Sequence, residues 1–113
     1  MVKGAYTLLI TPFRKDLSVD EEGLKLLVER QIESGIEGLA PLGVTGENTL
    51  MTDEEVLKVV KIICETANGR AKVAPDVCSS SLWMALDRVK RFADLGADYI
   101  CVFTPYFILP KVD

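Results

Sequence analysis

Histidine is absent from this 113-residue sequence. Its absence removes the side chain that most often acts as a general base near neutral pH, and also the commonest zinc ligand. The three cysteines, Cys64, Cys78 and Cys101, are not spaced as metal ligands and lie in apolar surroundings. They are therefore predicted to be buried free thiols in a reducing cytoplasm. No metal site and no cofactor are expected.

Long apolar runs and clusters of positive charge are also missing. No apolar run approaches the ~20 residues needed to cross a bilayer, and the run at residues 5–10 is too short for a secretory signal. The net charge is −4, and the 13 lysines and arginines form no block. We therefore expect a cytoplasmic protein that binds neither membranes nor nucleic acid.

The residues that are present alternate between strand and helix patterns. Short runs that are rich in apolar residues predict strands at residues 5–11, 36–42, 71–77 and 98–104. Between them lie three segments whose apolar residues recur at helical spacing. Strands that alternate with amphipathic helices about every 30 residues are typical of βαβ units with a parallel sheet.

Each predicted helix has recognisable start and stop signals. Capping boxes at Ser18–Glu21 and Thr52–Glu55 predict the first two starts, and Ser80 or Ser81 is expected to cap the third helix. The predicted stops are Gly35, Asn68-Gly69 and Gly96.

This pattern predicts an α/β fold and one domain over residues 1–113, and it leaves two architectures open. The first is the N-terminal half of a (β/α)8 barrel, with four parallel strands and three helices, and the second is a small doubly wound sheet. A doubly wound sheet that binds nucleotides often has a glycine-rich loop after its first strand. Residues 12–16 contain no glycine, which weakens the second alternative.

The most informative loop follows the second predicted strand. In parallel α/β folds the functional site forms at the carboxyl ends of strands. Here Gly43 and Gly46 flank Val44 and Thr45. The glycines allow the backbone to turn sharply and present N–H groups to an anion, and the Thr45 hydroxyl adds a donor. A tight turn without a ligand is the alternative interpretation.

Three short segments lie at the ends of predicted strands. They are residues 11–12 (TP), residues 43–47 (GVTGE) and residues 104–107 (TPYF). Together and in this order, they resemble the family of dihydrodipicolinate synthases and N-acetylneuraminate lyases. The resemblance covers essentially the whole chain and implies the N-terminal half of a TIM barrel. It also implies a class I aldolase that acts on pyruvate or another 2-keto acid, within a homo-oligomer.

The resemblance further implies roles for individual residues. In this family a lysine on the sixth strand forms a Schiff base with pyruvate, and the imine serves as an electron sink. Carried over, Thr45 would bind the pyruvate carboxylate by side chain and backbone, and Val44 by backbone alone, within the loop from Gly43 to Gly46. Tyr106 would be an accessory residue, either near this carboxylate-binding loop at the open end of the barrel or at a subunit contact.

Two positions depart from the family pattern in a way that affects proton transfer. The synthases have a hydroxyl residue before the threonine and a second tyrosine after the fourth strand, whereas this chain has Val44 and Phe107. Neither side chain can pass a proton, so a sugar-acid lyase or an inactive member is favoured over a true synthase. The loop at residues 76–79 (DVCS) also departs from the glycine-rich family pattern.

The chain contains eight lysines, but it ends before the sixth strand. No catalytic residue is therefore assigned, and two hypotheses remain. The first is the N-terminal portion of a Schiff-base aldolase, which has the carboxylate-binding loop but lacks the catalytic lysine. The second is an inactive, self-associating half-barrel with a structural or ligand-binding role. A half-barrel would leave its first and fourth strands as open edges, and the apolar side of its strands that faces away from the helices would be uncovered. Both features predict self-association in either case.

Overall fold

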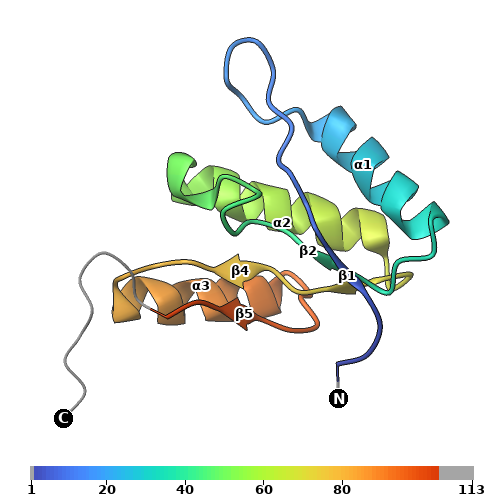
Figure 1. The fold of residues 1–113 in the computed structure, drawn as a ribbon. Coiled ribbons are helices and arrows are strands. Elements are labelled where there is room, and N and C mark those ends of the chain that lie inside the picture. Colours follow the sequence, from blue (N-terminus) through green and yellow to red (C-terminus); the bar gives the residue numbers. More distant parts are fainter. Residues whose placement is uncertain (1, 105–113) are drawn as a thin grey trace.

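The computed structural model describes residues 2–104, which form an α/β unit of short parallel strands and three α-helices (Figure 1). The strands are β1 (Tyr6–Leu8), β2 (Gly38–Ala40), β3 (Lys72–Val73), β4 (Asp76–Val77) and β5 (Cys101–Val102). The helices are α1 (Glu21–Glu33), α2 (Asp53–Ala67) and α3 (Leu82–Asp94), and a short 3-10 helix covers Asn48–Leu50.

All the strand pairs are parallel, as the βαβ pattern predicted. β2 lies between β1 and β3, and β4 pairs with β5. The predicted strand at residues 71–77 is thus divided into β3, which pairs with β2, and β4, which pairs with β5. Pro75 lies between the two pieces and has no N–H to donate, although its carbonyl accepts from the Cys101 N–H at 3.0 Å.

The ends of the helices largely follow the sequence signals. At the start of α2, the Thr52 hydroxyl accepts from the Glu55 N–H, and the Glu55 carboxylate accepts from the Thr52 N–H, which completes the predicted capping box. Ser81 caps α3. Asn68 ends α2 at a φ of 45°, in the left-handed conformation typical of a helix C-terminus.

The predicted capping box at Ser18 is wrong. Asp20 caps α1, and its carboxylate accepts from the Gly23 N–H at 3.2 Å. The N–H and hydroxyl of Ser18 instead donate to the carboxylate of Asp16. A carboxylate at Asp20 satisfies the same helix N–H groups and also interacts favourably with the positive end of the helix dipole.

The hydrophobic core lies between the strands and the helices. It includes Leu9, Leu24, Val28, Leu39, Val56, Val59, Val60, Ile63, Val73, Val77 and Phe92, all of them buried. The opposite face of the strands remains open, where Leu8, Ile10, Val102 and Phe103 are exposed. Among the described residues, the helix layer is therefore packed, whereas the inner face is left exposed. Within residues 2–104, no helix is long and apolar enough to cross a membrane.

Candidate functional site

The loop after β2 folds back on itself in a tight turn. The N–H of Gly46 donates to the carbonyl of Leu42 at 2.6 Å, and the N–H of Glu47 donates to the carbonyl of Val44 at 3.1 Å. The N–H of Asn48 donates to the carbonyl of Gly43 at 3.2 Å. These bonds occupy the second half of the loop and fix its shape.

Both glycines of this loop are required by its geometry. Gly43 has a φ of 55°, and a Cβ at Gly46 would lie 2.2 Å from the carbonyl oxygen of Leu42. The buried Thr11 hydroxyl donates to the Gly46 carbonyl at 2.7 Å and ties the loop to the segment after β1. Residues 11–12, one of the three segments that carry the resemblance, therefore support the loop through Thr11.

In the first half of the loop, the hydrogen-bond donors of Val44 and Thr45 are not used within the loop. Within the described part of the chain, no hydrogen bond is formed by the N–H groups of Val44 and Thr45 or by the Thr45 hydroxyl. The loop nevertheless presents fewer N–H groups than the sequence suggested, because that of Gly46 is already bonded. A carboxylate could therefore meet two backbone donors and one hydroxyl here.

A small cavity of about 110 Å³ lies beside these donors. Its lining is mostly apolar and comprises Leu8, Ala40, Leu42, Gly43, Val44, Thr45, Asp76, Cys101 and Phe103. The cavity opens at the carboxyl ends of the parallel strands, where functional sites form in this class of fold. The loop and the cavity together make up the candidate site.

Among the described residues of this lining, Asp76 is the one acidic residue. Its side chain is almost completely buried, with a residue exposure of 5%, and its Oδ1 has no hydrogen-bond partner in the structure described. Burial raises the pKa of this carboxyl to about 6. The sequence analysis gave Asp76 no role and placed it in a loop that departs from the glycine-rich pattern of the family. Its position near the carboxyl end of the strand predicted at residues 71–77 was the signal that could have identified it as part of the site.

The three cysteines are free and partly buried, close to the predicted buried thiols. Burial raises the pKa of Cys64 to about 11. Burial, with a smaller effect of the Asp76 charge, also raises the pKa of Cys101. Thiols with raised pKa values are poor nucleophiles at neutral pH, so Cys101 contributes to the cavity as an apolar wall.

Lysines in the described part of the chain are exposed and mostly form ion pairs. Lys58 pairs with Glu21 at 2.5 Å, and Lys72 pairs with Asp98 at 2.6 Å. The hydrogen bond to Asp98 raises the pKa of Lys72, which keeps the amine protonated. None of the lysines in residues 2–104 lines the cavity beside Thr45.

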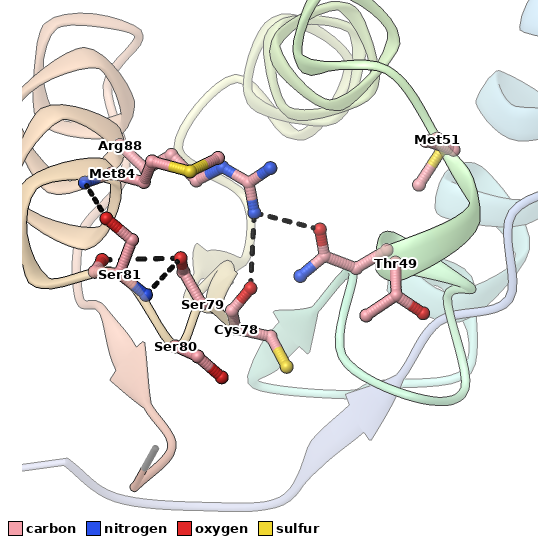
Figure 2. A pocket seen from close by; sticks show the side chains of 9 residues that line it. Thr49, Met51, Cys78, Ser79, Ser80, Ser81, Met84 and Arg88 are labelled. Atoms are coloured by element: carbon pink, nitrogen blue, oxygen red, sulfur yellow. Dashed lines mark hydrogen bonds between the residues drawn. The ribbon is translucent and has the colours of Figure 1, made fainter. Parts of the chain in front are cut away.

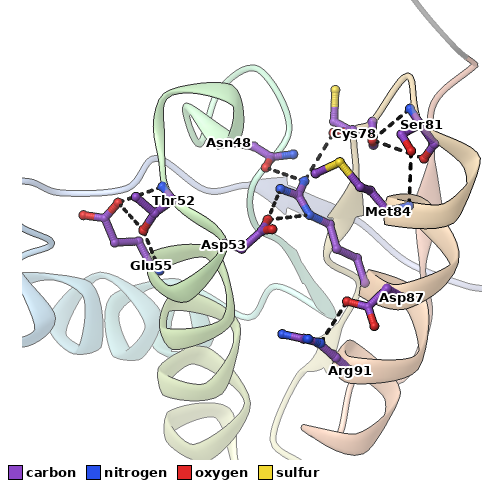
Figure 3. A network of polar contacts seen from close by, with 11 residues as sticks. Asn48, Thr52, Asp53, Glu55, Cys78, Ser81, Met84, Asp87 and Arg91 are labelled. Atoms are coloured by element: carbon purple, nitrogen blue, oxygen red, sulfur yellow. Dashed lines mark hydrogen bonds and ion pairs between the residues drawn. The ribbon is translucent and has the colours of Figure 1, made fainter.

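A second, larger pocket of about 380 Å³ lies outside the strands, between the loop after β2 and the start of α3 (Figure 2). The guanidinium of Arg88 joins the two sides. It donates to the side-chain carbonyl of Asn48 at 3.2 Å and to the backbone carbonyl of Cys78 at 3.3 Å. It also pairs with Asp53 at 2.5 Å (Figure 3). Sequence reasoning did not find this network, because its members are far apart in the chain.

Some of the predicted site residues cannot be placed. Tyr106, Phe107 and Lys111 lie outside the described residues, so their predicted roles remain predictions. Among residues 2–104, no cluster of cysteine, aspartate and glutamate side chains could hold a metal ion.

Comparison with known proteins agrees with this arrangement. The family model of the dihydrodipicolinate synthetase family matches residues 1–113, the full length of the chain. The chain belongs to this family. Among the family's members, the 4-hydroxy-tetrahydrodipicolinate synthase of Chloroherpeton thalassium is 41% identical over 110 residues, which are 97% of this chain and 36% of the relative.

Solved structures of the family share the same fold. The chloride-inhibited dihydrodipicolinate synthase of Acinetobacter baumannii, complexed with pyruvate, aligns with a TM-score of 0.95 and 34% identity. The N-acetylneuraminate lyase of Fusobacterium nucleatum aligns with a TM-score of 0.89 and 30% identity. Each alignment covers 98% of this chain and 38% of the other protein. The chain thus spans little more than a third of the length of its relatives and corresponds to a partial barrel.

Proposed function

We propose that this chain is the N-terminal half of a (β/α)8-barrel aldolase that uses a Schiff base with pyruvate. In this proposal it supplies the carboxylate-binding loop, and the catalytic lysine lies on a strand beyond residue 113. The observation that carries the proposal is the pair of unbonded N–H groups of Val44 and Thr45 with the Thr45 hydroxyl, at the edge of the cavity.

The geometry of the loop suits the carboxylate of a 2-keto acid. Three donors on two adjacent residues can bind the two oxygens of one carboxylate, and hydrogen bonds to an ionised group are stronger than neutral ones. The mostly apolar lining offers the rest of the ligand a surface for van der Waals contact. Gly43 and Gly46 contribute by allowing the turn.

The proposed reaction class follows from the absence of a hydroxyl group at Val44. Val44 has no hydroxyl and is 87% exposed at the loop's tip, so it cannot relay a proton in the way proposed for the synthases. We therefore favour a lyase that cleaves a 2-keto sugar acid over a synthase as the activity of the complete enzyme.

A titration with pyruvate tests the binding loop. In the wild-type chain, the amide signals of Val44 and Thr45 should shift saturably in NMR spectra as pyruvate is added. Thr45→Val should weaken binding by about tenfold or more, because a hydrogen bond to a charged group contributes roughly 1.5–3 kcal/mol. Thr49→Val removes an exposed hydroxyl outside the cavity and serves as the matched control. Equal affinities for the two variants would contradict the proposal.

Borohydride trapping tests whether the 113-residue chain contains a lysine that forms a Schiff base with pyruvate. After reduction with pyruvate present, mass spectrometry should find no stoichiometric adduct on the 113-residue chain. The physical reason is that an exposed lysine with a pKa near ~10.4 is almost entirely protonated at neutral pH. A single stoichiometric pyruvyl adduct on one residue, such as Lys111, would show that the chain contains its own catalytic amine.

A second candidate function is a self-associating half-barrel without turnover. It is favoured by the bare inner face, where Leu8 is 66% exposed and Phe103 is 52% exposed. Light scattering at micromolar concentration should then give a mass of at least two chains, and Leu8→Lys should reduce it to one. A wild-type mass of one chain would contradict self-association.

A further inference from the structure

Asp76 is a buried acidic residue that the proposed binding of a carboxylate by Val44 and Thr45 does not use. A Cβ built on Gly43 would lie only 2.8 Å from Asp76 Oδ2, so the carboxyl lies directly against the backbone of the loop. The side chain lines the same cavity as Thr45. An unpaired carboxyl in such a position is costly, because burial without a partner is unfavourable for a polar group and more so for a charge.

Within residues 2–104, the lining of the cavity offers Asp76 no compensating charge. β1 and β2 contribute Leu8 and Ala40 to the lining, and the loop contributes Gly43, Val44 and Thr45. The one titratable neighbour from β5 is the Cys101 thiol, whose own pKa is raised by burial first and by Asp76 to a smaller extent. None of these groups can neutralise an ionised Asp76, so the neutral acid is the better tolerated form.

We propose that Asp76 is a binding group of this cavity, and that its protonated carboxyl donates a hydrogen bond to the carboxylate of the 2-keto acid held by the Thr45 loop. This inference rests on the proposed function for the class of ligand. It assigns Asp76, Val44 and Thr45 to one anion, with the aspartate supplying the fourth donor.

The proposal predicts that binding takes up a proton. When Asp76 is ionised, it must first gain a proton from solvent, and the proton then lies between its carboxyl and the ligand carboxylate. No other bond forms or breaks. The end of an aspartate side chain turns about a broad torsion, so either oxygen can present the proton to the cavity.

The test is the affinity for pyruvate as a function of pH, measured from the amide shifts of the loop. Pyruvate remains ionised throughout the range from pH 5 to pH 8. With a pKa of about 6 for Asp76, the protonated fraction falls from about 0.9 to about 0.01, so the wild-type affinity should fall by up to about a hundredfold. Asp76→Asn, whose amide donates at any pH, should bind with nearly constant affinity.

Glu54→Gln provides the matched control, because Glu54 is an exposed acid on the first turn of α2. It should keep the wild-type pH dependence. An affinity that is constant with pH in the wild type, or that is higher at pH 8, would overturn the role of Asp76 and leave the proposed function intact. Failure of pyruvate to bind at any pH would instead overturn the proposed function itself.

A measurement on the wild-type chain covers the case in which Asp76→Asn does not fold. The carbon-13 signal of the Asp76 carboxyl reports its titration directly. Saturating pyruvate should raise this pKa by at least about one unit, because a proton shared with the ligand is held more tightly. An unchanged or lowered pKa in the presence of bound pyruvate would contradict the proposal.

Discussion

Leu8 and Leu9 are identical neighbours in β1 and the segment after it, yet they lie in opposite environments. Leu9 is 2% exposed and packs in the core between strands and helices, whereas Leu8 is 66% exposed on the inner face. Successive side chains of an extended segment point to opposite faces, so this pair compares the two sides of the sheet directly. In residues 2–104 the helix side is packed, and the inner side is exposed.

A second contrast holds for acidic residues at the two ends of the strands. At the amino end, Asp98 accepts from Lys72 at 2.6 Å and from the N–H of Val73 at 3.0 Å. In the cavity beside Thr45, Asp76 lies unpaired among mostly apolar residues. The charge of Asp98 is therefore paired, whereas Asp76 is an unsatisfied group. Unsatisfied polar groups in folded proteins are often functional.

The largest expected effect comes from truncating the two leucines in turn. Leu9→Ala should lower the free energy of unfolding by about 2–5 kcal/mol, because it leaves a cavity in a packed core. Leu8→Ala should change it by only about 0.5 kcal/mol in the monomer. Urea unfolding at low protein concentration measures both. A large cost of Leu8→Ala that grows with protein concentration would show that a second copy covers the inner face.

The next effect concerns Asp76 and has a defined sign. Its pKa rises from 3.8 in the unfolded chain to about 6 in the folded one. Because the unfolded state loses this proton first, the free energy of unfolding should fall as the pH rises between about 4 and 6, by up to about 3 kcal/mol. Asp76→Asn should remove this loss and be more stable than the wild type at pH 8, as judged by thermal unfolding.

Asp98→Asn serves as the control of opposite sign. Burial tends to raise the pKa of Asp98, but the hydrogen bonds from Lys72 and Val73 lower it overall. Its stabilising contribution is present above the unfolded pKa and is lost as the pH falls. Asp98→Asn should therefore destabilise the chain at pH 8. If both variants shifted stability in the same direction, the contrast between the paired and the unpaired aspartate would be wrong.

The smallest effect should be seen at the cap of α2, in the outer layer. Thr52→Ala removes the side chain that accepts from the Glu55 N–H and should cost about 1 kcal/mol. Thr49→Ala, at an exposed threonine of the 3-10 helix, should cost less than about 0.5 kcal/mol. Melting temperatures of the two variants provide the comparison, and equal losses would argue against the capping box as a stabilising feature.

Local sequence signals predicted most of the fold. The three helices were predicted from apolar spacing, the capping box at Thr52 and the stop at Asn68. The start of α1 was assigned to Ser18 instead of Asp20, because two polar residues near the boundary could both accept from the helix N–H groups. The division of the third strand at Pro75 was also missed, since it depends on which neighbour each half pairs with.

The candidate site could likewise be predicted only in part from the sequence. The two glycines and Thr45 could be named from the sequence, because a sharp turn with free donors requires those residue types over a few consecutive positions. The placement of Asp76 against Gly43, and the bond from Thr11 to Gly46, could not be foreseen. These contacts join residues about 33–35 positions apart.

The sequence by itself thus determined the helices, the parallel βαβ order and the tight glycine turn after β2, because each depends on periodicity or on turn chemistry within a few residues. Only the tertiary structure decided which face of the strands is packed, which loop donors remain unbonded, and that Asp76 lies unpaired beside them. The physical reason is that burial and hydrogen-bond satisfaction depend on neighbours that distant strands bring together, and no local pattern specifies them.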